Sequence, residues 1–137
     1  MVEYLNVSEA SDGQIAQITA LYRGNNWWSA AQDNPELVNA IVVGSHCFIL
    51  AQEGDRLVGM GRAISDGASD AYLQDVTVHP DFRGQGIGAE LVRRLVERLH
   101  ADGLRWIGVI AEGDSQPLYA KLGFSVFAGA TPLLRLD

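Results

Sequence analysis

Residues 71–91 carry the sequence AYLQDVTVHPDFRGQGIGAEL. The β-rich run Tyr72–Val78 stops at His79 and Pro80, and the glycine-rich turn Arg83–Gly88 then opens directly into an amphipathic helix. Three glycines ahead of a helix leave backbone N–H groups that no side chain shields. Those groups add to the positive end of the helix dipole, so the turn is suited to binding an anion, most often a phosphate.

Three other interpretations of this turn can be weighed from the sequence. Gly84, Gly86 and Ala89 satisfy the dinucleotide-binding pattern G-x-G-x-x-G/A. That fold places its first glycine at a strand end, whereas residues 79–83 intervene here, and it needs several more strand–helix units than can follow Ala89. A P-loop is excluded because Gly-Lys-Ser/Thr is missing. A tight loop without a ligand stays open, because glycines alone also build such loops.

Hydrophobic periodicity and turn residues predict the elements around this stretch. Helices are predicted at residues 12–24, capped by Ser11 or Asp12, and at 34–43, 87–102 and 115–122. Strands are predicted at residues 4–7, 47–52, 56–64, 71–78, 104–110, 124–127 and 133–136. The order indicates the α/β (α+β) class: a single mixed, mostly antiparallel sheet with helices on both faces. We expect residues 1–137 to form one domain, because this length supports one core and is too short for two.

The charge balance restricts the partners of the protein. Ten basic and 17 acidic residues give a formal net charge of −7. A nucleic-acid-binding face needs clustered Lys and Arg, so no nucleic acid is expected. The acidic balance is compatible with a cationic substrate such as an amine, and equally with a role in solubility alone.

Cysteine and histidine usage gives no sign of a disulfide or a metal. Cys47 is the only cysteine, and its apolar neighbours indicate a buried, inert thiol. The histidines show no metal-ligand spacing with carboxylates or with Cys47, so no metal is expected. No apolar run approaches the length of a membrane span, and the first residues lack the blocks of a signal peptide. These features predict a cytoplasmic protein without membrane contact.

Two motifs resemble a known family. The turn Arg83–Gly88 resembles the Arg/Gln-x-x-Gly-x-Gly/Ala signature of the GNAT superfamily of N-acetyltransferases, and Val76–Pro80 is similar to that family's strand ending in V-x-P. Pro117–Phe124, with the sequence PLYAKLGF, is similar to its C-terminal FYEKLGF segment. The predicted order of elements also matches the GNAT fold, so the resemblance covers nearly the whole chain.

The resemblance implies acetyl-CoA, or coenzyme A, as cosubstrate. The backbone at Val76, Thr77 and Val78 would pair with the pantetheine amides and donate to the thioester oxygen. An asparagine that the family often carries before its tyrosine is missing here, and Ser115 or Gln116 is the expected replacement. The pyrophosphate would be bound by Arg83, Gly84, Gln85, Gly86, Ile87 and Gly88.

Catalytic and acceptor residues follow from the same resemblance. Tyr119 matches the family tyrosine near the cofactor sulfur and would protonate the leaving thiolate; a ring that only packs under the sheet is the alternative. Asp75 lies close to the expected reaction centre, where it would act as a base toward the amine or as a structural hydrogen-bond acceptor. Trp27 and Trp28 would line the acceptor pocket, unless one of them packs in the core.

The predicted function is transfer of an acetyl group from acetyl-CoA to a primary amine, by direct attack in a ternary complex. The buried Cys47 does not support an acyl-enzyme. A regulatory acetyl-CoA-binding module without turnover is one alternative, and acetylation of a protein lysine or N-terminus is another. A homodimer is common among such proteins, although no residue of the sequence indicates one. The sequence does not identify the acceptor amine.

Overall fold

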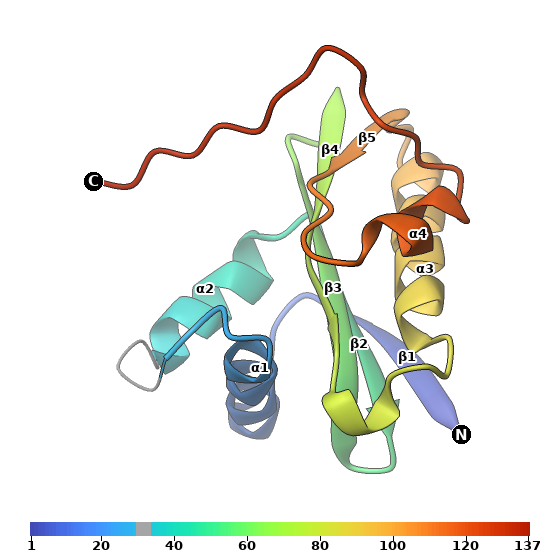
Figure 1. Ribbon diagram of the computed structural model, residues 1–137. Coiled ribbons are helices and arrows are strands. Elements are labelled where there is room, and N and C mark those ends of the chain that lie inside the picture. Colours follow the sequence, from blue (N-terminus) through green and yellow to red (C-terminus); the bar gives the residue numbers. More distant parts are fainter. Residues whose placement is uncertain (30–33) are drawn as a thin grey trace.

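The computed structural model describes residues 1–29 and 34–137, which form a five-stranded sheet with helices on both faces (Figure 1). The strands lie in the sheet in chain order, and all neighbours are antiparallel except the parallel pair β4 and β5. This arrangement confirms the predicted mixed, mostly antiparallel sheet. The strands are β1 (Val2–Val7), β2 (Cys47–Glu53), β3 (Arg56–Ser65), β4 (Asp70–Val78) and β5 (Trp106–Val109).

Each face of the sheet packs against two helices, with a separate apolar core between sheet and helices. One capping box, in which Ser11 and Gln14 bond to each other's backbone N–H, starts the first helix as predicted. Asn34 caps the second helix by accepting the N–H of Leu37. The helices are α1 (Asp12–Gly24) and α2 (Pro35–Gly44) on one face, and α3 (Ile87–Ala101) and α4 (Gln116–Ala120) on the other (Figure 1). Within the described ranges, no helix is long and apolar enough to cross a membrane.

A β-bulge interrupts β4 where it pairs with β3. The register shifts between Met60 and Arg62, so that Asp75 and Val76 together oppose Gly61. Asp75 has φ of 57°, in the left-handed region that Asp tolerates better than most non-glycine residues. Gly61 has no side chain to obstruct the bulge; a Cβ there would lie 3.2 Å from Val76 Cγ2. The bulge therefore depends on the residue types of both strands.

The bulge changes which side chains share a face of β4. Regular alternation predicts Gln74, Val76 and Val78 on one face. In the structure Val76 and Val78 pack against the core under α3, to which Leu73 also belongs. Gln74 follows Leu73 directly and therefore points to the opposite face. The prediction for Gln74 was wrong because an extra residue in a strand leaves no mark in the alternation.

Asp75 is held in its unusual conformation from two directions. The hydroxyl of Tyr22 in α1 donates to Asp75 Oδ2 over 2.7 Å, and Arg62 Nε in β3 donates to the same oxygen over 2.7 Å. The Arg62 and Asp75 side chains are only 16% and 22% exposed, so water screens this ion pair weakly. We call Tyr22, Asp75 and Arg62 the Asp75 clamp. It ties α1 to the strand that carries the bulge.

The strands predicted at residues 124–127 and 133–136 are absent from the structure. Phe124 still packs on the core, where its ring lies 5.6 Å from that of Tyr119. Beyond Phe124 no residue belongs to a strand, and every residue from Ser125 to Asp137 is exposed. The prediction was wrong because apolar residues and a glycine-containing turn indicate strand propensity, whereas a strand also needs a neighbour to pair with.

Tyr22 gives the clamp a pH dependence. Burial, together with the negative charge of Asp75, raises the pKa of the Tyr22 phenol well above its usual 10.0. The unfolded chain then ionises Tyr22 first as the pH rises past 10, so this contribution to stability is present at lower pH and lost above it. Tyr22→Phe should lower stability near neutrality by about 1 kcal/mol. It should also remove about 1.4 kcal/mol of the loss that the wild type suffers between pH 8 and pH 11.

Urea unfolding at these two pH values measures both effects. If wild type and Tyr22→Phe lose the same stability on going from pH 8 to pH 11, Tyr22 is not held protonated by the clamp.

Candidate active site

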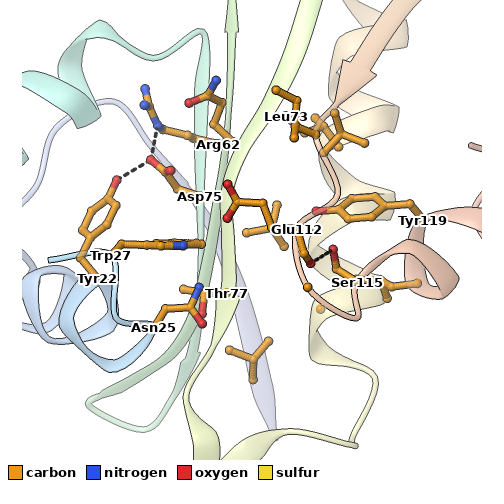
Figure 2. A pocket seen from close by; sticks show the side chains of 18 of the residues that line it. Tyr22, Asn25, Trp27, Arg62, Leu73, Asp75, Thr77, Glu112, Ser115 and Tyr119 are labelled. Carbon is orange, nitrogen blue, oxygen red and sulfur yellow. Dashed lines mark hydrogen bonds and ion pairs between the residues drawn. The ribbon is translucent and has the colours of Figure 1, made fainter. Parts of the chain in front are cut away.

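A cleft of about 970 Å³ opens where β4 and β5 separate. The two strands pair only from Asp70 to Leu73, opposite Trp106–Val109, and they diverge beyond those residues. The cleft is lined on one side by residues 72–78 of β4 and on the other by Tyr119 and residues 109–110 and 112–115 (Figure 2). The end of α1 with the loop after it, and the start of α3, also line the cleft, as do Ile41 of α2 and Arg62 of β3.

The backbone of β4 presents hydrogen-bonding groups to the cleft at alternate residues. The N–H of His79 donates to the carbonyl of Val58 in β3 over 2.8 Å. Because backbone groups alternate in direction along a strand, those of Val76 and Val78 point away from β3, toward the side from which β5 has departed. Thr77 faces β3 with its backbone and lines the cleft with its side chain, which is buried. Of the three predicted residues, Val76 and Val78 are therefore the ones whose amides a ligand can reach.

The glycine-rich turn leads directly into α3. Gly84 and Gly86 have φ of 79° and 83°, values that side-chain-bearing residues rarely adopt. Gly86 is the N-cap of α3 and no side chain caps that end, so the first N–H groups of the helix are available to an anion. The side chain of Ile87 is buried in the core, which leaves only its backbone for binding. Gly88 lines the cleft, and this connects the turn to it.

Arg83 links the turn to its surroundings. Its Nε donates to the carbonyl of Val78 over 3.0 Å, and a terminal nitrogen lies 3.5 Å from Asn25 Oδ1 at the end of α1. Arg83 lines the cleft, whereas Gln85 is exposed and does not. The guanidinium therefore brings a positive charge to the cleft beside the N-terminus of α3, an arrangement that fits a bound pyrophosphate.

Tyr119 is the buried phenol of the site. Its side chain is 7% exposed, it packs edge-on against Phe124, and its hydroxyl points into the cleft (Figure 2). Burial raises the pKa of Tyr119 above its usual value, so the group stays protonated through neutral pH. No hydrogen-bond partner for the hydroxyl is found in the described part of the chain. Tyr119 therefore packs its ring in the core and turns a protonated hydroxyl toward the cleft, and its role as the acid stays a prediction.

Residues 112–115 form the wall of the cleft next to Tyr119. The Ser115 hydroxyl donates to the backbone carbonyl of Glu112 over 2.7 Å, so its proton is already engaged. The carboxylate of Glu112 points into the cleft toward the space between Asp75 and Tyr119 (Figure 2). Among the described residues, nothing forms an ion pair or hydrogen bond with that carboxylate. Sequence reasoning considered this stretch only for a missing asparagine and overlooked Glu112 as an acidic group of the site.

The tryptophans line the opposite wall. The Trp28 ring stacks on Tyr22 with centroids 4.1 Å apart and planes 9° apart, and the Trp27 ring lies 6.0 Å from Tyr22 at 55°. Both line the cleft and both also pack against the core under α1 and α2. Each tryptophan thus has one side in the core and another toward the cleft, and Tyr22 joins them to the Asp75 clamp.

Tyr22 and Arg62 were not predicted as site residues. The spacing of Tyr22 in its helix predicts a residue of the apolar stripe, where its ring indeed packs, and gives no sign that its hydroxyl reaches Asp75. An arginine inside the otherwise apolar strand of residues 57–64 was the available signal, because a charge in a buried strand needs a partner. In the described part of the chain, no group of three or more His, Cys, Asp or Glu side chains is arranged to hold a metal ion.

Solved structures support the fold. A probable acetyltransferase of unknown function from meticillin-resistant Staphylococcus aureus superposes with a TM-score of 0.83 at 19% identity, over 100% of this chain and 99% of that one. A predicted acetyltransferase from Clostridium acetobutylicum, solved with acetyl-CoA, superposes with a TM-score of 0.75 at 17% identity, over 98% and 96% of the two chains.

Sequence comparison identifies relatives and a family. A histone acetyltransferase from Glycine max, TAP1, is 39% identical over 131 residues, which are 90% of this chain and 57% of that protein. The chain spans about half the length of the curated relatives it matches. The model of the acetyltransferase (GNAT) family matches residues 13–124, from α1 to the end of the segment Pro117–Phe124 that contains Tyr119. The chain belongs to the GNAT acetyltransferase family.

Proposed function

We propose that the protein transfers an acetyl group from acetyl-CoA to a primary amine by direct attack in a ternary complex. The observation that carries this proposal is one continuous cleft with an anion-binding turn at Gly88 and a buried, protonated phenol at Tyr119. Family membership supports acetyl-CoA as the donor. A cleft of this size also leaves room for an acceptor beside the donor.

The donor would be held along the β4 edge. Backbone N–H groups from Gly84 to Gly88, together with Arg83, would bind the pyrophosphate. Val76 and Val78 would pair with the pantetheine amides as an added strand does, and one of their N–H groups would stabilise the thioester oxygen as negative charge develops on it. Tyr119 would then donate its proton to the departing thiolate.

The acceptor must lose a proton before it attacks, because an alkyl ammonium has a pKa of about 10.4. We assign this role to Glu112, whose carboxylate faces the cleft without a partner among the described residues. Asp75 accepts two hydrogen bonds, one of them from a guanidinium, and we assign it to positioning of β4. Trp27 and Trp28 would form an aromatic wall suited to the aryl or alkyl part of the amine.

Acetylation of a protein amine is the second candidate function. The relative from Glycine max that aligns with 90% of this chain is named a histone acetyltransferase. The open cleft would admit an extended lysine side chain as well as a small amine. The acceptor class is therefore the first quantity to measure.

Thiol release from acetyl-CoA in the presence of a panel of amines tests the proposed function. The panel should contain aryl-alkyl amines, aliphatic amines and lysine-containing peptides. We expect release that depends on the amine and saturates with it. Tight binding of acetyl-CoA, without thiol release for any amine or peptide, would contradict the enzyme and favour a regulatory binding module.

Tyr119→Phe should lower kcat by about 10²-fold or more, because it removes the proton donor while keeping the packed ring. The KM for acetyl-CoA should change little. Tyr72→Phe is the matched control, since Tyr72 also lines the cleft and is 41% exposed; its kcat should equal that of the wild type. Equal kcat values for both variants would remove Tyr119 from the chemistry.

The pH–rate profiles of Glu112→Gln and Asp75→Asn test which of the two carboxylates acts as the base toward the amine. Glu112→Gln should be slow near neutrality and should recover as the pH approaches the pKa of the amine, about 10.4, because the amine then loses its proton unaided. Asp75→Asn should lower the rate at all pH values without such recovery. Recovery in Asp75→Asn alone would assign the base to Asp75, and recovery in neither variant would assign it to water.

A further inference from the structure

Two polar side chains of the cleft lie side by side on β3 and β4. Arg62 and Gln74 both line the cleft, and they are direct partners in the register of the two strands. Side chains opposite each other on antiparallel strands share a face of the sheet, with Cβ atoms about 5 Å apart. The adjacent residues Ala63 and Leu73 belong to the core under α3. Arg62 and Gln74 therefore lie on the other face, where α1 and α2 pack.

The guanidinium of Arg62 has more N–H groups than the protein uses. Its Nε donates to Asp75 Oδ2 over 2.7 Å, and one terminal nitrogen donates to Ser45 Oγ over 3.4 Å. The Tyr22 hydroxyl also lies beside it. A guanidinium has five N–H groups, so these neighbours leave some of them without a partner in the described part of the chain. Because Arg62 lines the cleft, the remaining N–H groups can donate to a ligand there (Figure 2).

The side-chain amide of Gln74 completes a pair that matches a peptide group. Gln74 is exposed, and nothing in the described residues forms a hydrogen bond with its side chain. A primary amide has both N–H donors and a carbonyl acceptor, whereas a guanidinium has donors only. A peptide carbonyl can therefore accept from Arg62 and from Gln74, while a peptide N–H donates to Gln74 Oε1. The exposure of Gln74 allows a peptide to lie across it at the surface.

The charges of the cleft favour a neutral peptide group over a carboxylate at this pair. Three carboxylates line the cleft, those of Asp75, Glu112 and Asp114. The charge of Arg62 is already paired with Asp75 over 2.7 Å. A carboxylate of the acceptor would therefore lie beside a like charge and a neutralised guanidinium. A peptide carbonyl accepts the same N–H groups without that repulsion.

The distance to the reaction centre favours a lysine side chain over an α-amine. Gln74 lies two residues before Val76, the nearer of the two residues whose backbone would hold the thioester. Strand geometry places them about 6 to 7 Å apart. An α-amine shares one carbon with its peptide carbonyl and is too short for this distance, whereas lysine has a four-carbon stem. Trp28 and Ile41 line the same cleft and can pack along that stem.

We propose that Arg62 and Gln74 bind a peptide group of the acceptor, and that the acceptor is a lysine side chain within a peptide or protein. This inference rests on the proposed transfer to a primary amine and names its substrate class. The peptide group would bind the Arg62–Gln74 pair, the methylene groups would lie along Trp28 and Ile41, and the amine would reach Glu112.

The chemical step is that of the proposed function. The lysine nitrogen forms a bond to the acetyl carbon, and the bond from that carbon to sulfur breaks. The lysine ammonium loses two protons in the whole reaction. One leaves through Glu112, and the other replaces the proton that Tyr119 gives to the thiolate.

Thiol release from acetyl-CoA with three matched amines tests this proposal. The methylamide of Nα-acetyl-lysine carries a lysine amine and two peptide groups, hexylamine carries an alkyl amine without a peptide group, and alanine methylamide carries an α-amine beside a peptide group. The first two amines have similar pKa values of about 10.4, so protonation does not separate them. We expect kcat/KM to be about 10²-fold higher for the lysine compound than for hexylamine. Alanine methylamide should also be a poorer substrate than the lysine compound.

Gln74→Met tests the recognition pair, because it keeps the length of the side chain and removes its hydrogen bonds. Gln74 is exposed and has no partner in the described residues, so this variant should fold. The preference for the lysine compound over hexylamine should fall about 10-fold. Gln52→Met is the matched control, since the Gln52 amide donates to the Gly54 carbonyl and does not line the cleft. Its preference should equal that of the wild type.

Each contrary outcome separates this inference from the proposed function. Equal kcat/KM for hexylamine and the lysine compound would overturn the inference and leave acetyl transfer to an amine standing. A higher kcat/KM for alanine methylamide would overturn the assignment to lysine, and an unchanged preference in Gln74→Met would overturn the role of the pair. Thiol release with none of the amines would contradict the proposed function and the inference together.

Discussion

The left-handed conformation of Asp75 is the constraint on which the cleft depends. One extra residue at this point of β4 moves Val76 and Val78 onto the face that packs under α3 and shifts the pairing with β3. An aspartate in this conformation is stable only when its surroundings hold it, and Tyr22 and Arg62 do so through one carboxylate oxygen. β4 separates from β5 beyond Leu73, just before the bulge, and the cleft lies in that separation.

The same contact joins the two halves of the site. Trp28 stacks on the Tyr22 ring, and the Tyr22 hydroxyl binds Asp75, whose neighbour Val76 turns its backbone to the cleft. The aromatic wall and the strand edge are therefore mechanically connected through two side-chain contacts. A positive charge from Arg83 and the N-terminus of α3 lies at one end of the cleft, whereas Glu112 and the protonated Tyr119 lie along it. This separation suits an anionic donor and a basic acceptor.

Local sequence predicted the secondary structure wherever the signal was local. The caps at Ser11 and Asn34 start helices, and the apolar stripe from Ile87 to Leu99 is buried as its spacing requires. The predictions that were wrong depended on pairing between distant segments. The bulge at Asp75 involves a shift against β3, and residues 124–127 and 133–136 found no strand to pair with in the described chain. Hydrophobic alternation along a strand indicates which side chains are buried. It does not indicate the register of the strand against its neighbour, or which strand that neighbour is.

The sequence by itself determined the fold class and the glycine-rich turn before α3, because both depend on short-range signals along the chain. It also indicated Tyr119 through a motif. Only the tertiary structure decided which amides of β4 face the cleft, that Asp75 is bound by Tyr22 and Arg62, and that Glu112 faces the space between Asp75 and Tyr119. These contacts join residues up to 53 positions apart, and their geometry follows from how sheet and helices pack.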